Sequence, residues 1–310
     1  MASWQSHLIK FALRVMKSLG HPSSSIQQER AKVEARVAFV PKKRNVTYEP
    51  CNVEGMHAEW VTAPGASALR VILYLHGGAY IVGSVNTHRT MAADLSHVTR
   101  ARVLVVEYRL APEHPFPAAV DDALITYRWL ISQGVSPRRL VVTGDSAGGG
   151  LTAALLVAAR DAGEPMPAAA VCLSPFVDLA MTGASMKTKV KADVMLQAEL
   201  FAPVIKAYLG EADPCTPLAS PLYADLYCLP PLLIQVGTDE LLLDDATRLA
   251  ARARAAGVEA TLEVWDGMFH TWQAWGIILP EAGRAMARIG EFVSAHLECE
   301  TSELARNGQT

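Results

Sequence analysis

Cysteine is scarce in this sequence and is never paired at close spacing. The five cysteines are odd in number and include no Cys-x-x-Cys pair: Cys51, Cys172, Cys215, Cys228 and Cys299. This pattern argues against a disulfide framework and against a structural zinc site of the usual spacing. We therefore expect reduced thiols and a cytoplasmic location.

Long apolar runs and an excess of positive charge are also missing. No apolar stretch approaches the roughly 18 residues that a membrane span requires, so no span is expected. The 28 Lys and Arg against 31 Asp and Glu give a net charge of -3, without a basic stripe to follow a phosphate backbone. Nucleic acid is therefore not an expected partner. No metal-ligand cluster or phosphate loop is evident, and we expect no metal and no cofactor.

The N-terminal segment does not look like a secretory signal, because Lys10, Arg14 and Lys17 interrupt every apolar stretch in it. Its apolar residues instead recur at helical spacing: Trp4, Leu8, Phe11, Ala12, Val15 and Leu19. We expect an amphipathic helix that packs on its own protein. Binding to a membrane surface is the alternative.

Apolar residues dominate the rest of the 310-residue chain, which has the composition and length of one large globular domain. Short apolar runs alternate with helical patterns and predict an α/β fold with a mostly parallel, eight-stranded sheet. The predicted parallel strands are 71–75, 102–108, 140–144, 169–173, 232–237 and 261–265. The predicted helices are 86–99, 118–132, 149–162, 242–256 and 281–297. Two alternating runs, 46–53 and 56–63, predict an antiparallel edge.

Two segments do not follow this alternation. An α/β sheet carries its active site beyond the carboxyl ends of its strands, so helical additions there would form a cap. We assign residues 1–45 and 181–212 to a helical cap. Residues 46–180 and 213–300 then form the catalytic domain, and 301–310 a tail.

Ser146 lies in the sequence Gly-Asp-Ser-Ala-Gly, after the strand at 140–144 and before a helical pattern. A GxSxG motif in that context predicts a nucleophile elbow, a strained turn that lifts the serine hydroxyl above the sheet. Glycine at positions 144 and 148 allows the backbone to fold back tightly. We expect Ser146 to be a nucleophile.

A nucleophilic serine needs a base, and the base needs an acid to orient it; in this fold they follow in the order serine, acid, histidine. Only His270 and His296 lie far enough along the chain. His296 falls on the terminal helical pattern, where a solvated surface position is expected. His270 follows a predicted strand and a turn, and we expect it to be the general base.

Asp239 is the first carboxylate after its strand, and we expect it to accept a hydrogen bond from the imidazole. The adjacent Glu240 is expected to point elsewhere. Asp244 and Asp245 are interpreted as helix-dipole or surface charges. Asp266 is the rival acid, because it lies near the histidine in sequence, but a turn-forming role is favoured.

An oxyanion hole needs N–H donors, and Ala147, directly after the nucleophile, supplies one. The segment His-Gly-Gly-Ala-Tyr after an early strand supplies the others, from Gly77 and Gly78. An apolar substrate pocket could include four residues, for each of which a core position is equally open: Met195, Leu196, Leu200 and Leu241.

Six motifs in order resemble the bacterial hormone-sensitive lipase family (family IV) of α/β-hydrolase esterases, in its GDSAG branch. They are HGGAY at 76–80, EYRLAPEHPFPAAVDD at 107–122, GDSAG at 144–148, SPFVDL at 174–179, GTDELLLDD at 237–245 and GMFHTW at 267–272. The resemblance extends from about residue 48 to residue 296. It implies a triad of Ser146, Asp239 and His270 and an oxyanion hole of Gly77, Gly78 and Ala147. The family often has HGGG, and Ala79 here replaces the last glycine.

The resemblance also implies a helical cap, no cofactor, and homodimers through an edge strand. The predicted function is a serine carboxylesterase that hydrolyses short- to medium-chain esters through an acyl-enzyme. The alternatives are an amidase or arylformamidase with the same triad, and a small-molecule receptor of the same fold. Such receptors lack the catalytic histidine, so His270 speaks against that alternative.

Overall fold

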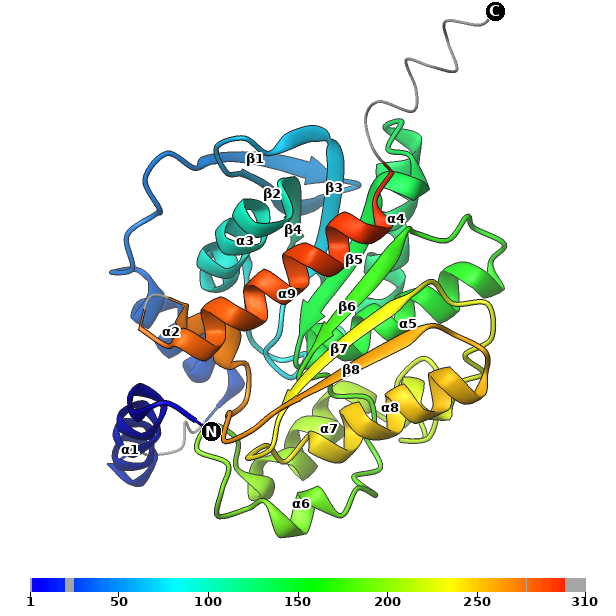
Figure 1. Cartoon of the computed structure of the whole chain (residues 1–310). Coiled ribbons are helices and arrows are strands. Elements are labelled where there is room, and N and C mark those ends of the chain that lie inside the picture. Colours follow the sequence, from blue (N-terminus) through cyan, green and yellow to red (C-terminus); the bar gives the residue numbers. More distant parts are fainter. Residues whose placement is uncertain (1, 20–24, 277, 299–310) are drawn as a thin grey trace, which may run out of the picture.

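The computed structural model describes residues 2–19, 25–276 and 278–298 of the chain (Figure 1). An eight-stranded sheet forms its centre, in the order β1-β2-β4-β3-β5-β6-β7-β8. Strand β2 runs antiparallel to β1 and β4, and the strands from β4 to β8 are all parallel. The predicted α/β fold with an antiparallel edge is confirmed.

Every predicted apolar run forms a strand. The strands are β1 (Thr47–Val53), β2 (Met56–Thr62), β3 (Ser67–Leu75), β4 (Ala101–Val106), β5 (Leu140–Asp145), β6 (Ala169–Leu173), β7 (Leu232–Gly237) and β8 (Ala260–Trp265). All residues of β5, β6 and β7 are buried. A strand covered on both faces cannot alternate between apolar and polar residues, which explains the continuous apolar runs.

Five long helices cover the two faces of the sheet: α3 (Val85–Thr99), α4 (Ala118–Ser132), α5 (Ala147–Asp161), α8 (Leu243–Ala255) and α9 (Pro280–His296). Helices α3 and α9 pack on one face, and α4, α5 and α8 on the other (Figure 1). Each corresponds to a predicted helix within two residues at either end. The burial of apolar side chains between these layers forms the main core.

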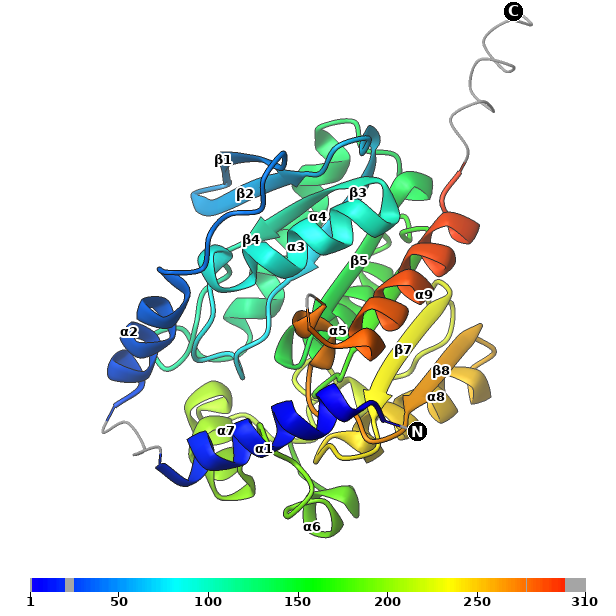
Figure 2. The same cartoon turned by 60° about the vertical axis from the view of Figure 1, so that its left-hand side comes forward.

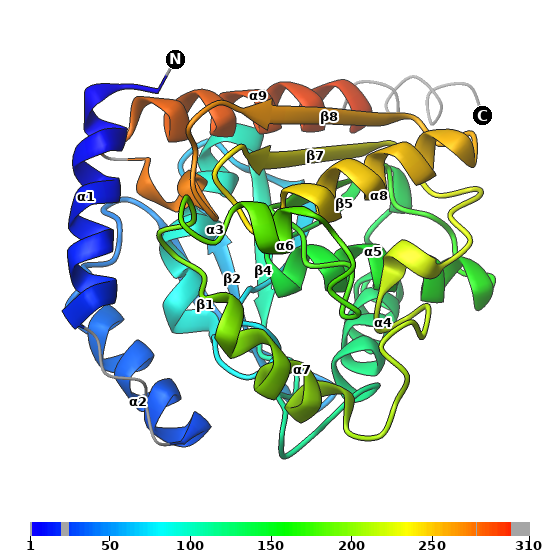
Figure 3. The ribbon, with the colours of Figure 1, turned by 90° about the horizontal axis from the view of Figure 1, so that it is seen from below.

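The segments that break the alternation form shorter or peripheral helices: α1 (Trp4–Leu19), α2 (Ile26–Val37), α6 (Ser185–Thr188) and α7 (Phe201–Leu209). Figure 3 shows α1, α6 and α7 at the end of the sheet where the parallel strands terminate. Helix α2 is fixed by Arg30, which donates from Nε to the Ile81 carbonyl at 2.6 Å and pairs with Glu113 at 2.7 Å. Among the described residues, no helix is long and apolar enough to cross a membrane.

Helix α1 lies along the outside of the molecule (Figure 2). Its inward side carries the buried residues Ser6, Ile9 and Lys10. Lys10 pairs with Asp239 at 3.0 Å, and Lys17 donates to the Asp193 carbonyl at 3.1 Å. The apolar side faces outward, with exposed fractions of 68% at Trp4, 59% at Leu8, 65% at Phe11 and 40% at Val15. The predicted amphipathic helix therefore packs on its own protein, but the predicted apolar stripe is not the side that makes the contact. Carboxylate and carbonyl acceptors on the underlying loops bind the lysines. Ile9 and Leu13 pack on an apolar cluster beside these acceptors, and both kinds of contact determine the orientation.

Candidate active site

Ser146 occupies a strained turn between β5 and α5. Its backbone has φ 54° and ψ -119°, a conformation that L residues rarely adopt. A Cβ at Gly148 would lie 1.9 Å from the Leu75 carbonyl oxygen, and one at Gly144 would lie 2.3 Å from the Gly148 carbonyl oxygen. Both positions therefore require glycine. The local geometry is that of the predicted elbow, with a half-buried serine at its tip.

His270 is held by a carboxylate from the neighbouring strand end. Its Nδ1 lies 2.9 Å from Oε2 of Glu240, and both side chains are buried. The other oxygen of Glu240 accepts hydrogen bonds from the Gly237 N–H at 2.6 Å and from the Ser174 hydroxyl at 2.8 Å. A carboxylate held at three points can orient the imidazole and leave Nε2 for proton transfer.

Asp239 does not contact His270, so the predicted acid is wrong. Its Oδ2 accepts from Lys10, and its N–H donates to the Met268 carbonyl at 3.1 Å. The turn after β7 directs Glu240 back under the strand ends and Asp239 outward to α1. The rival, Asp266, is exposed in the turn after β8.

Four consecutive strand ends contribute to this arrangement. Ser146 follows β5, Ser174 follows β6, Glu240 follows β7 and His270 comes shortly after β8. Ser174 also accepts a hydrogen bond from the Thr271 N–H at 3.3 Å, so it links the acid to the histidine loop. Ser174 is not among the site residues predicted from the sequence. The only signal was a serine directly after an apolar strand, in a motif of the related family.

Electrostatics favour a basic imidazole. Burial alone lowers the pKa of His270, but the hydrogen bond and negative charge of Glu240 outweigh it, and the net pKa is raised above 6.5. Burial in turn raises the pKa of Glu240, against the opposing effect of the imidazole. Such coupling stabilises the imidazolium that forms when the base takes a proton.

The hydroxyl of Ser146 makes no hydrogen bond with His270 among the residues that the structure describes. The negative charge of Asp145, the residue directly before the serine, contributes to the raised pKa of His270, so the turn and the histidine lie within electrostatic range of each other. Catalytic hydrogen bonds often become short only when substrate is bound. In the described chain, the nucleophile and the base therefore lie at the same edge of the sheet without a hydrogen bond between them.

The Gly77 N–H is already occupied, which corrects the predicted oxyanion hole. It donates to Oδ1 of Asp145 at 3.0 Å, and a Cβ at Gly77 would lie 2.3 Å from the other carboxylate oxygen. Gly77 is thus required for close packing. Within the described chain, the N–H groups of Gly78 and Ala79 have no acceptor, and Ala147 begins α5, where N–H groups lack helical partners.

Asp145 supports the glycine loop from below. It is buried and accepts from the Tyr74 hydroxyl at 2.7 Å, with Nε2 of His88 at 3.6 Å. Burial alone raises the pKa of the Asp145 carboxyl group. His88 and Tyr74 lower it by more than burial raises it, and the net pKa is about 2. The Asp145 carboxylate, ionised at neutral pH, connects the elbow to the glycine loop through the Gly77 N–H.

The predicted pocket residues have different environments. Met195 and Leu200 are exposed, Leu196 is half-buried, and Leu241 is fully buried in the main core. The N–H groups of the residues at 195, 196 and 241 all donate to the carboxylate of Asp193. The structure thus brings three of the four to one loop, but Leu241 serves packing there.

An aromatic cluster not predicted from the sequence lies beside the nucleophile. The Phe176 N–H donates to the Ser146 carbonyl at 2.9 Å, and the rings of Phe176 and Phe201 are 5.3 Å apart. The ring of Tyr80, which follows the glycine loop, stacks on Tyr208 at 3.8 Å. Phe201 and Tyr208 belong to α7, so this helix contacts the segments on both sides of the elbow.

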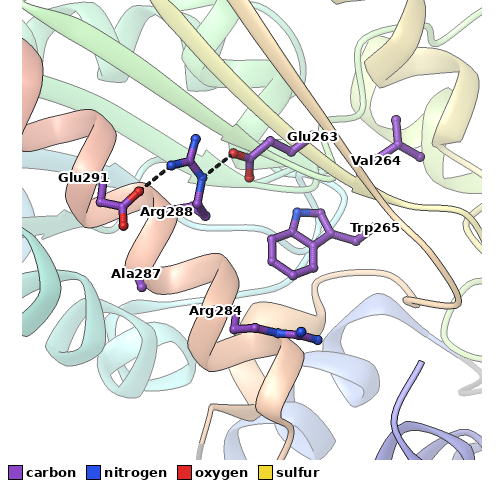
Figure 4. A pocket seen from close by; sticks show the side chains of 7 residues that line it. All are labelled: Glu263, Val264, Trp265, Arg284, Ala287, Arg288 and Glu291. Atoms are coloured by element: carbon purple, nitrogen blue, oxygen red, sulfur yellow. Dashed lines mark hydrogen bonds and ion pairs between the residues drawn. The ribbon is translucent and has the colours of Figure 1, made fainter. Parts of the chain in front are cut away.

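A hollow of about 450 Å³ lies elsewhere, between β8 and α9. Figure 4 shows that Arg288 bridges Glu263 and Glu291 across it. None of the residues of the Ser146 site lines this hollow. It is therefore separate from the candidate active site.

Comparison with known proteins agrees with this geometry. A family model described as alpha/beta hydrolase fold matches residues 72–274. The crystal structure of an esterase from the bacterial hormone-sensitive lipase family superposes with a TM-score of 0.92 and 47% identity, over 96% of this chain and 100% of that one. The chain belongs to the bacterial hormone-sensitive lipase family.

Two named relatives are also similar to this chain in sequence. An acetyl-hydrolase from Streptomyces hygroscopicus is 48% identical over 236 residues, which is 76% of this chain and 79% of the relative. An esterase from Acinetobacter venetianus is 36% identical over 289 residues, or 93% and 94% of the two chains.

Proposed function

We propose that Ser146, His270 and Glu240 form the catalytic triad of a serine carboxylesterase. The observation that carries this proposal is the buried Glu240–His270 pair, at the same sheet edge as the strained Ser146 turn. Membership of the hormone-sensitive lipase family, with relatives named esterase and acetyl-hydrolase, makes the protein a carboxylic ester hydrolase.

The proposed reaction has two symmetrical halves. His270 Nε2 takes the Ser146 proton as Oγ attacks the ester carbonyl carbon, and the carbonyl oxygen becomes negative. The N–H groups of Gly78, Ala79 and Ala147 stabilise that oxyanion. The intermediate then expels the alcohol, which receives the proton from His270. Water attacks the acyl-enzyme by the same route and releases the carboxylic acid.

Replacement of the nucleophile tests the proposal directly. Ser146→Ala should lower kcat for p-nitrophenyl butyrate by about 10⁴-fold or more, because no other group forms the acyl-enzyme. Ser136→Ala, at a loop serine without a side-chain cap hydrogen bond, is the matched control and should keep full activity. A folded Ser146→Ala protein with undiminished hydrolysis would refute the assignment.

Short- to medium-chain esters are the proposed substrates. The aromatic rings of Phe176, Phe201 and Tyr208 support this choice, since they fill space beside the elbow and limit the room for a long acyl chain. Rates measured across p-nitrophenyl esters from acetate to palmitate should fall as the chain lengthens. A matched amide distinguishes the amidase alternative, and turnover of any simple ester excludes a non-catalytic receptor.

Three further assignments remain proposals. Helices α1, α2, α6 and α7 form the cap, a role supported by their place at the end of the sheet that carries Ser146. A homodimer through the edge strand β8 is supported by its unpaired outer side. A cytoplasmic location is supported by the four described cysteines, which are all free.

A further inference from the structure

The outward side of α1 carries a continuous stripe of large apolar side chains. We define the exposed stripe as Trp4, Leu8, Phe11 and Val15, spaced four, three and four residues apart and therefore on one side of the helix. More than half of the surface of each of the first three side chains is accessible. Isolated exposed apolar residues are normal on soluble proteins, but an aligned row of them marks an interaction surface.

The charge of α1 is of one sign. Its sequence, WQSHLIKFALRVMKSL, contains three basic residues and no Asp or Glu, although the whole chain has a net charge of -3. Lys10 and Lys17 face inward, whereas Arg14 and His7 are exposed on the helix that carries the stripe. Aromatic and aliphatic residues beside basic ones are typical of helices that lie in a lipid–water interface.

The inward side of α1 is fixed independently of the stripe. Lys10 is nearly buried and donates to Asp239 and to the Gly267 carbonyl, both at 3.0 Å. At the start of the helix, the N–H of Ser3 donates to the Glu281 carboxylate at 2.7 Å. The stripe is therefore presented on a helix that stays attached to the protein. Insertion into an interface requires no unfolding of the helix.

We propose that α1 docks the enzyme on anionic lipid surfaces by inserting the exposed stripe, with Arg14 contacting lipid headgroups. A second copy of the chain fits this surface less well. A two-fold contact places the same patch of both subunits together, so the two Arg14 side chains would lie near each other, and α1 has no Asp or Glu to pair with them. An anionic interface, in contrast, complements both the apolar stripe and the positive charge.

Vesicle binding tests the proposal. The full chain is sedimented with vesicles of phosphatidylcholine containing phosphatidylglycerol, and with phosphatidylcholine alone. The triple variant Trp4→Ser, Leu8→Ser, Phe11→Ser should lose about tenfold or more in partitioning to the anionic vesicles, because the buried apolar area is removed. Arg14→Gln should lose about fivefold on anionic vesicles only. The control Leu69→Ser, Ile125→Ser, at exposed apolar residues elsewhere, should bind like the wild type.

Hydrolysis of soluble p-nitrophenyl acetate verifies that each variant is folded and should be unchanged. Absence of wild-type binding, or equal binding of the triple variant, would overturn the proposal. Sedimentation velocity provides a separate outcome: if the triple variant dissociates a wild-type dimer and vesicle binding is absent, a second copy occupies the stripe and the lipid proposal is wrong.

Discussion

Single side chains at the strand ends determine whether His270 can act as a base. Glu240 uses both carboxylate oxygens, one for the imidazole and one shared by the Gly237 N–H and Ser174. Its neighbour Asp239 bonds instead to Lys10. Two adjacent carboxylates thus have different roles, which separate substitutions can distinguish.

Glu240→Gln should lower kcat for p-nitrophenyl butyrate by about 10⁴-fold, because an amide cannot stabilise the imidazolium or hold the same tautomer. Asp239→Asn should lower kcat far less. Steady-state kinetics of both variants, with KM measured separately, compare the two roles. The assignment fails if Asp239→Asn is the more damaging change.

The pH dependence should follow the raised pKa of His270. Only the neutral imidazole accepts the serine proton, so kcat/KM should fall as the pH decreases through that pKa, with a midpoint above 6.5. In Glu240→Gln the carboxylate that raises the pKa is gone, and the midpoint of the residual activity should move to lower pH. Identical midpoints would contradict the coupling of the pair.

At the scale of single residues, the sequence predicts which strand ends carry the site residues. It does not predict which of two adjacent carboxylates points toward the histidine. The motif context identifies Ser146 and His270, because a strand before and a helix or turn after them restrict their positions. Asp239 and Glu240 differ only in the direction of the turn after β7, which depends on packing against the 266–270 loop. The sequence also does not predict that the Gly77 N–H is unavailable to an oxyanion. That N–H donates to the Asp145 carboxylate, which packs against the Gly77 backbone.

At the scale of secondary-structure elements, α1 is tied to the two loops that carry the acid and the base. Lys10 reaches the Asp239 carboxylate and the Gly267 carbonyl, while Lys17 reaches the loop of Asp193. Hydrophobic periodicity correctly predicts the helix but not which face lies inward. That choice depends on acceptors more than 170 residues away along the chain, which local pattern does not contain.

Lys10→Met should loosen α1 and reduce kcat/KM by less than about tenfold, because Lys10 positions the loops without contacting the reacting groups. The acid-limb midpoint of the pH profile should stay at its wild-type value, unlike that of Glu240→Gln. Stability should fall by about 1–2 kcal/mol in urea unfolding, since a nearly buried charge pair is broken. Lys10→Arg is the control and should restore most of the loss; a shifted pH midpoint would contradict a positioning role.

For the whole molecule, the order and type of the strands are readable from the sequence because the sheet is buried on both faces. Fully buried strands give long apolar runs, and the intervening helices give clear periodicity. The half-buried helices α6 and α7 lack so clear a signal. The position of α6 depends on polar contacts such as that of Asp244 in α8, whose carboxylate accepts from the Ser185 N–H at 3.0 Å. Next to it in α8, the carboxylate of Asp245 accepts from the Val177 and Asp178 N–H groups at 2.9 Å.

Asp245 should make stability decrease with rising pH. Burial raises its pKa from 3.8 to about 8, so the folded state holds a proton that the unfolded state has released between these values. The free energy of unfolding should therefore fall across this window, by at most about 1.4 kcal/mol per pH unit. Asp245→Asn keeps an acceptor oxygen but cannot titrate. Urea unfolding between pH 5 and pH 8 should show the wild type losing stability relative to the variant; parallel curves would contradict the burial argument.

The partners of α1 also have a consequence for biosynthesis. Three of its anchors, Asp239, Gly267 and Glu281, lie in the last quarter of the chain. The ribosome makes this helix before it makes these anchors, so the helix cannot dock at them until they have emerged. Until then, the exposed stripe and the two lysines are all open to solvent, so the nascent chain presents an apolar and basic helix to chaperones.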